Sequence, residues 1–191
     1  ILQTILDNQD AIDRWDTDIT PEDMMLAKQI RQHFRNKLMM RRLKDQKISG
    51  FMQTVDTILD NDQSYNTEMI PVLIKLPGFY EEDIKTSEIF SKAVNPKKIN
   101  KMRVVNVDED LFSIGSVTRD SRTQKIETFY FLNQNKTLFA ASCKSNSVES
   151  RAWHYICGKQ KIHVTGTARK AAKPGQEVYY FELQRDIQIK D

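Results

Sequence analysis

Residues 161–169 read KIHVTGTAR, residues 173–176 read KPGQ, and residues 178–183 read VYYFEL. The first and last of these stretches are rich in β-branched and aromatic residues, which are enriched in strands. The Pro-Gly pair between them is a turn signal. The pattern therefore predicts two strands joined by a turn near the end of the chain, followed by a further strand-like stretch that includes Ile187 and Ile189.

The same composition extends back to about residue 100. Segments of similar character, separated mostly by polar turns, occupy residues 102–107, 111–119, 124–132, 137–143, 161–169 and 177–189. Five or six strands in about 90 residues are typical of a small barrel or sandwich. We therefore expect a β-domain over residues 100–191.

The closing hairpin and the strands before it resemble an OB-fold, a five-stranded Greek-key barrel used to bind oligonucleotides. The resemblance covers about residues 102–191 and lies in the pattern of strands and turns. The chain is also similar in style to small phage replication-region proteins that end in such a hairpin. The resemblance implies a nucleic-acid-binding module of a viral or phage-type replication or accessory protein.

In the N-terminal half, the apolar residues are spaced as in helices. Thr20 and Pro21 form a helix start, because threonine caps helices and proline suits the first helical position. Apolar residues then recur at helical spacing and predict an amphipathic helix over about residues 20–45. Ser49 offers a second cap, and the apolar residues after it predict a shorter helix over about 49–60.

Residues 69–80 are apolar and contain Pro71 and Pro77. Proline disfavours helix interiors, so this segment is expected to be a short buried extended connector. A short helix is expected over about 81–93, and the Asn95-Pro96 pair indicates a boundary. The predicted fold class is thus α+β, with a helical region at 1–95 packed on a five- to six-stranded OB-like β-barrel at 100–191.

Charge divides the chain in the same way. Residues 1–95 carry a net charge of −4 and residues 96–191 carry +7, within a total of +3 over 191 residues. A basic half attracts polyanions. The sequence has no apolar run of the ~20 residues that a membrane span needs and no signal-peptide pattern at its start. With only two cysteines, a reduced protein of the cytoplasm, or of the host cytoplasm if viral, is expected.

Single-strand binding requires aromatic faces for base stacking and cations for phosphates. The β-rich half offers both kinds of residue, and the candidate nucleic-acid-binding residues are Arg119, Arg122, Lys125, Tyr130, Lys144, Arg151, Trp153, Tyr155, Lys161, Arg169, Lys170 and Tyr179. Lys159 and Lys173 are further candidate phosphate partners.

The alternative is that these aromatic residues form the core. The strand at 177–183 has large apolar side chains on both faces, Tyr179 and Phe181 on one and Tyr180 on the other. A small barrel can enclose only one of these sets. The other set must be covered, either by the N-terminal helices or by nucleic acid, and the sequence leaves both possibilities open.

A second basic patch lies near the end of the long helix and comprises Arg35, Lys37, Arg41, Arg42, Lys44 and Lys47. Cations complement a helix C-terminus, which explains part of the cluster. Phosphate contact, a solvated surface and, with the nearby methionines, a docking site for a protein partner are the remaining interpretations.

Metal binding and catalysis receive little support. Cys143, His154, Cys157 and His163 are separated by ten, two and five residues, which matches no familiar zinc spacing. The acidic runs at 81–83 and 108–110 favour solvated carboxylates over a metal site, and no phosphate-binding glycine loop occurs. No metal, cofactor or small-molecule substrate is therefore expected.

The favoured function is non-enzymatic binding of nucleic acid, single-stranded and weakly sequence-selective, in replication, recombination or transcription. A protein partner is expected to dock on the helical region. The alternative is a protein–protein interaction or assembly subunit that uses the Met-rich helix and the barrel face.

Overall fold

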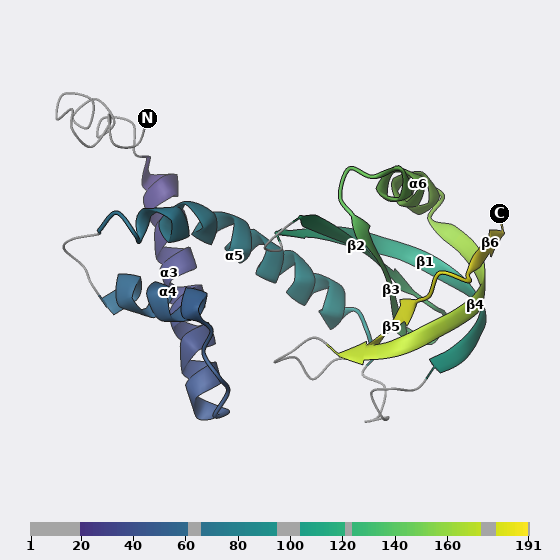
Figure 1. The fold of residues 1–191 in the computed structure, drawn as a ribbon, viewed down its shortest axis with the longest axis horizontal. Helices are drawn as coiled ribbons and strands as arrows, with labels where there is room; N and C mark the ends of the chain where they lie inside the picture. Colours follow the sequence, from purple (N-terminus) through teal and green to yellow (C-terminus); the bar gives the residue numbers. More distant parts are fainter. Residues whose placement is uncertain (1–19, 61–65, 95–103, 121–123, 173–178, 191) are drawn as a thin grey trace. The chain divides into compact units, whose positions relative to one another are not determined.

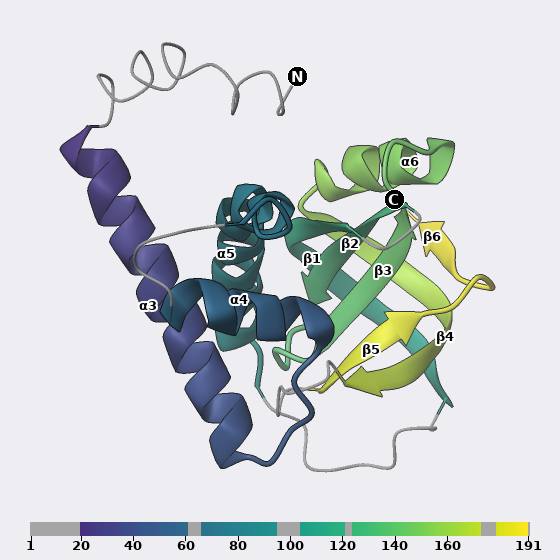
Figure 2. The same ribbon diagram turned by 60° about the vertical axis from the view of Figure 1, so that its left-hand side comes forward.

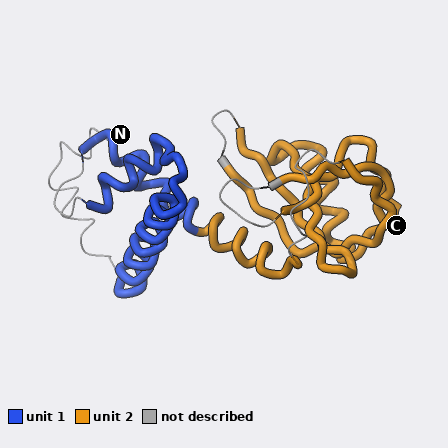
Figure 3. Tube along the Cα trace, turned by 90° about the horizontal axis from the view of Figure 1, so that it is seen from below, with its two compact units in different colours: residues 1–80 blue, residues 81–191 orange. Residues whose placement is uncertain are grey.

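The computed structural model describes residues 20–60, 66–94, 104–120, 124–172 and 179–190 (Figure 1). The chain divides into two compact units, residues 1–80 and residues 81–191 (Figure 3). Helices form the first unit and a mixed sheet dominates the second, so the fold class is α+β. Within the described residues, every helix is too short or too polar to cross a membrane.

The first helix, α3 (Pro21–Leu43), begins where the sequence predicted. The Thr20 side chain accepts a hydrogen bond from the Asp23 N–H at 3.1 Å, and the Asp23 carboxylate accepts one from the Thr20 N–H at 3.0 Å. This reciprocal arrangement is a capping box, which satisfies two backbone donors that the helix itself leaves unpaired.

The second helix, α4 (Gly50–Asp60), follows Ser49, whose hydroxyl accepts from the Met52 N–H at 3.4 Å. The amphipathic faces of α3 and α4 meet in one core, as their spacing predicted. Its buried members are Ile30, Phe34, Leu38, Met52, Val55, Leu59 and Leu76.

The extended connector expected at 69–80 is wrong, because residues 70–91 form one helix, α5 (Ile70–Ser91). The helix expected over about 81–93 is present, but it is the C-terminal half of this longer helix. Pro71 lies in its first turn, where a missing N–H costs no intrahelical hydrogen bond. Pro77 lies inside the helix and removes one such bond. Burial of Leu76 in the first unit and of Phe90 in the second offsets this loss. The division between units falls within α5, not near residue 95.

The described residues of the second unit form six strands: β1 (Val104–Asp120), β2 (Lys125–Leu132), β3 (Leu138–Lys144), β4 (Lys161–Ala172), β5 (Tyr179–Leu183) and β6 (Gln188–Lys190). Their order in the sheet is β1-β2-β3-β5-β4-β6, and β1 also pairs with β4, so the pairings return to their starting strand (Figure 2). All pairs are antiparallel except β3–β5.

A helix absent from our sequence predictions, α6 (Val148–Cys157), connects β3 to β4. Its Trp153 packs against Phe129 and Phe131 of β2 at ring-centroid distances of 6.2 and 5.6 Å. This core includes Val107, Leu111, Phe139, Ile162, Val164 and Leu183. Its members alternate along each strand, as a sheet with a buried face requires.

The opposite face of the sheet is also covered. Ile89 and Phe90 of α5 pack on residues that include Tyr130 of β2 and Leu138 of β3. The ring centroids of Phe90 and Tyr180 are 6.1 Å apart. The next residue of β5, Phe181, points to the other face of the sheet and packs against the core that contains Trp153. Of the two possibilities left open by the sequence, a helix therefore occupies the second face around Tyr180.

Candidate nucleic-acid interface

The ends and orientation of α6 follow from its local sequence. Ser147 caps the helix by accepting from the Ser150 N–H at 3.0 Å, and Glu149 in the first turn complements the positive helix end. Ser150 and Trp153 are buried. Arg151 and Tyr155, one turn apart, are exposed on the other side.

A buried carboxylate holds α6 on the sheet. Glu127 of β2 accepts from the Ser150 hydroxyl at 2.7 Å and from the Ser116 hydroxyl at 3.3 Å. The His154 Nε2 lies 3.0 Å from Oε1 of Glu127, the oxygen that also accepts from Ser116. Three partners from β1 and α6 thus satisfy a carboxylate that would be costly to bury alone. These contacts hold α6 in place, with its outer side facing solvent.

Among the Phe, Tyr and Trp residues that the structure describes, only Tyr155 is largely exposed, at 72%. Arg151 lies one turn before it, and Lys159 lies four residues after it with its Nζ 5.1 Å from the Tyr155 ring centroid. Arg151, Tyr155 and Lys159 are called the α6 surface below. This surface combines a largely exposed ring, with the Lys159 ammonium over it, and a second cation one turn away. Rings and cations are the two elements needed to bind a base and its phosphates.

Several candidate residues belong to the core instead. Trp153 is 6% exposed and Tyr130 is 3% exposed, so neither can offer a face to a base. Burial raises the pKa of Tyr130 to about 12. Lys170 is buried with its Nζ 4.9 Å from the Tyr179 ring centroid and 5.7 Å from that of Phe181. These three side chains therefore pack inside the unit. The stacking roles expected for Trp153 and Tyr130 and the phosphate contact expected for Lys170 are wrong.

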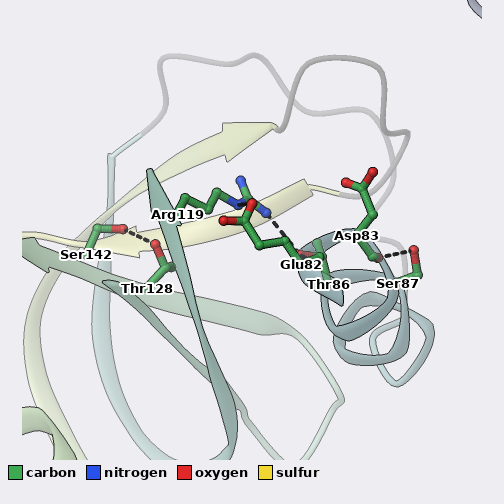
Figure 4. A network of polar contacts seen from close by, with 7 residues as sticks. All are labelled: Glu82, Asp83, Thr86, Ser87, Arg119, Thr128 and Ser142. Atoms are coloured by element: carbon green, nitrogen blue, oxygen red, sulfur yellow. Dashed lines mark hydrogen bonds and ion pairs between the residues drawn. The ribbon is translucent and has the colours of Figure 1, made fainter. Parts of the chain in front are cut away.

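Two candidate cations are engaged in contacts within the unit. Arg119 of β1 donates to the Thr86 hydroxyl at 3.0 Å and lies 3.9 Å from Glu82, both on α5 (Figure 4). Lys161 of β4 pairs with Asp110 of β1 at 2.8 Å. Both cations connect neighbouring elements of the fold.

The remaining candidates are dispersed over the sheet unit. Lys125, Lys144 and Arg169 are exposed on β2, β3 and β4, and Tyr179 on β5 is partly exposed. Arg122 and Lys173 lie outside the described residues. Of the predicted set, only Arg151 and Tyr155 share one face of α6. Lys159 lies two residues beyond the end of this helix, with its Nζ near the Tyr155 ring.

The second basic patch belongs to the helical unit. Arg35 donates to the Leu59 carbonyl at 3.1 Å, Arg42 pairs with Asp56, and the Lys37 Nζ lies 5.7 Å from the Phe34 ring centroid. The first two contacts join α3 to α4. The other members are Arg41, which is partly buried, and Lys44 and Lys47, which are exposed.

The residues weighed as zinc ligands are placed in different surroundings. Cys143 and Cys157 are free thiols, and burial raises the pKa of each. His154 contacts Glu127, whereas the His163 ring nitrogens each lie 2.9 Å from a carboxylate, Nδ1 from Asp110 and Nε2 from Asp108. In the described part of the chain, no group of three or more such side chains is arranged to hold a metal.

Helix α6 was not predicted from the sequence, and neither was the relation between Arg151, Tyr155 and Lys159. Their four-residue spacing and the Ser147 cap are signals that would have shown it. The comparisons add no relative: no protein-family model, curated protein or solved structure matches the chain.

Proposed function

We propose that the sheet unit is an OB-like barrel that binds single-stranded nucleic acid through the α6 surface, with little sequence selectivity. The observation that carries the proposal is Tyr155, 72% exposed, with a cation four residues away on either side. Bases of every kind can stack on such a ring, and the cations can contact phosphates. The processes that this activity fits are replication, recombination and transcription.

The strand pairings support the barrel part of the proposal. β1 pairs with β2 through its C-terminal half and with β4 through its N-terminal half. The five strands β1, β2, β3, β5 and β4 therefore follow one another in a cycle. Five strands in a Greek-key barrel are the hallmark of the OB-fold, a frequent oligonucleotide-binding scaffold.

Electrostatics support the ligand class. Residues 81–191 carry 19 Lys and Arg against 14 Asp and Glu. This balance attracts a polyanion at low salt. Much of the sheet face around Tyr130 is covered by Phe90, which leaves the outer side of α6 as the place where an open ring and cations coincide.

The test is a salt titration of binding to a fluorescein-labelled single-stranded DNA of about 15 nucleotides, near the upper end of known site sizes. Each phosphate contact should contribute about −0.7 to the slope of log K against log salt. Arg151→Ala and Lys159→Ala should each make the slope shallower by about that amount. Lys85→Ala, a change at an exposed lysine of α5, is the matched control and should leave it unchanged. No binding at low salt, or equal slopes for all variants, would refute the proposal.

A second candidate function, a protein–protein interaction or assembly subunit, is favoured by the exposed apolar side chains of α3. They are Met24, Met25, Leu26, Met39, Met40 and Leu43. Methionine adapts readily to a partner surface. Such an interface would respond little to salt, so a partner complex that survives moderate salt and is lost in Met39→Gln would support this function.

A further inference from the structure

The β3 strand has one edge that is only partly used. Along its whole length it pairs with β2, but on the other edge it pairs with β5 only at Phe139 and Ala140. Beyond Ala140, none of the described strands pairs with that edge. Residues 141–144 thus present the backbone of an edge strand, which is a template for another extended chain.

The course of the chain after β5 explains this opening. Leu183 pairs with Ala168 of β4, and the Gln184 N–H donates to the Thr167 carbonyl at 2.9 Å. These contacts direct the chain along β4 towards β6, so β5 parts from β3 after two paired residues (Figure 2).

A groove of about 590 Å³ lies beside the free edge. Ala141 and Cys143 of β3 line one side, Trp153 and Ile156 of α6 line the second, and Ile187 and Ile189 line the third. Because alternate residues of a strand point to the same side, a chain added to β3 would direct every second side chain into this apolar groove.

The rim of the groove carries two cations, Lys144 on β3 and Arg185 after β5. Both are exposed, and neither makes an ion pair within the portion of the chain that the structure describes. Glu149 also lines the groove, but it lies in the first turn of α6, where the helix N-terminus complements its charge. The rim therefore favours a ligand with carboxylates next to its apolar residues.

We propose that the free edge of β3 binds an extended peptide in which apolar and acidic residues alternate. The peptide backbone pairs with residues 141–144, its apolar side chains enter the groove, and its carboxylates face Lys144 and Arg185. This is recognition by strand addition, in which main-chain hydrogen bonds supply affinity and side-chain pockets supply specificity. The site uses none of the three residues of the α6 surface.

The probe is a labelled peptide of about eight residues with alternating isoleucine and aspartate, somewhat longer than an average strand. A peptide of the same composition with its aspartates in one block is the control ligand. With the 191-residue chain, the alternating peptide should bind and shift backbone amide NMR signals of residues 141–144 and 184–189. The double variant K144E/R185E should weaken binding by about tenfold or more and should prefer an alternating isoleucine–lysine peptide.

Tyr155→Ala is the matched variant and should bind the peptide as the unmodified chain does. Equal binding of the two peptides, unchanged affinity in K144E/R185E, or signal changes elsewhere would overturn the proposal. Two other occupants of the edge would also overturn it. The first is single-stranded DNA that shifts the same amide signals and displaces the peptide. The second is another copy of the chain paired through β3, which would be seen as a concentration-dependent dimer that Ser142→Pro abolishes.

Discussion

Arg119 donates a hydrogen bond from its Nη2 to the Oγ1 of Thr86 at 3.0 Å, and Thr86 is fully buried. The Thr86 hydroxyl in turn donates to the Glu82 carbonyl at 2.6 Å (Figure 4). A charged group on β1 thereby fixes a buried hydroxyl of α5 within the second unit. The contact explains why Arg119 serves the fold although its residue type suggested a phosphate partner.

Replacement of Arg119 by methionine should lower the free energy of unfolding by about 1.5–3 kcal/mol, the range for a hydrogen bond that involves a charged group. Arg151→Met makes the same substitution at an exposed site and should change stability by less than about 0.5 kcal/mol. Urea unfolding followed by Trp153 fluorescence, in a Trp15→Phe background, measures both. Equal stability of the two variants would show that the Arg119–Thr86 contact contributes nothing.

The two neighbouring aromatic residues of α6 should behave in opposite ways. Trp153→Ala removes a ring from the core and should cost about 3–5 kcal/mol of stability. Tyr155→Ala, at an exposed position, should cost less than about 0.5 kcal/mol. Urea unfolding followed by circular dichroism distinguishes them, and a large loss in Tyr155→Ala would place its ring in the core.

Gly166 of β4 has φ of 143° and lies against the chain before β6. A Cβ at this position would approach the Ile187 Cα to 2.8 Å, so Gly166→Ala combines backbone strain with a clash. We expect destabilisation of at least about 1 kcal/mol. Gly78→Ala is the control, because a Cβ there meets nothing within 4 Å inside α5. It should stabilise the helix by about 0.5–1 kcal/mol. Loss of stability in both variants would contradict this account.

His163 should titrate above its usual range. The hydrogen bond to Asp110, and to a lesser extent the one to Asp108, raises the pKa of His163. The pKa of Asp110 is lowered, mainly by the hydrogen bond from Lys161 and also by the one from His163. A raised histidine pKa stabilises the folded state fully below the unfolded pKa of about 6.5. This stabilisation is lost as the pH rises through the folded value. NMR titration of the His163 ring should show a pKa above 6.5 that falls in Asp110→Asn, and an unchanged value in that variant would contradict the contact.

Much of the fold follows from local signals. The start of α3 is predictable from Thr20, Pro21 and Asp23. The β-branched and aromatic stretches predict most of the strands of the sheet. The N-terminal half of α5 was missed because the proline rule, applied to Pro71 and Pro77, ignores the tertiary burial of Leu76 and Phe90 that offsets a lost hydrogen bond. Helix α6 was missed because it is short, and tertiary contacts such as that of Ser150 with Glu127 help to fix it.

Candidate site residues were less accessible to prediction. Tyr130, Trp153 and Tyr155 look alike in the sequence, and only the packing partners Phe90 and Phe129 show which rings are covered. The same is true of the cations, because the acidic residues that pair with them lie far away in the sequence. Residue type indicates what a side chain can bind, whereas topology decides whether it is free to do so.

The central claim is that an open tyrosine on α6 stacks a base of single-stranded nucleic acid. Its most direct test is the affinity of the 191-residue chain for the labelled single-stranded DNA at one low salt concentration, with Tyr155→Ala and Tyr155→Phe compared. Tyr155→Ala should weaken binding by about 1–3 kcal/mol, roughly 5- to 150-fold in Kd, while Tyr155→Phe keeps the ring and binds nearly as well. Equal affinity of the alanine variant and the unmodified chain would contradict the claim.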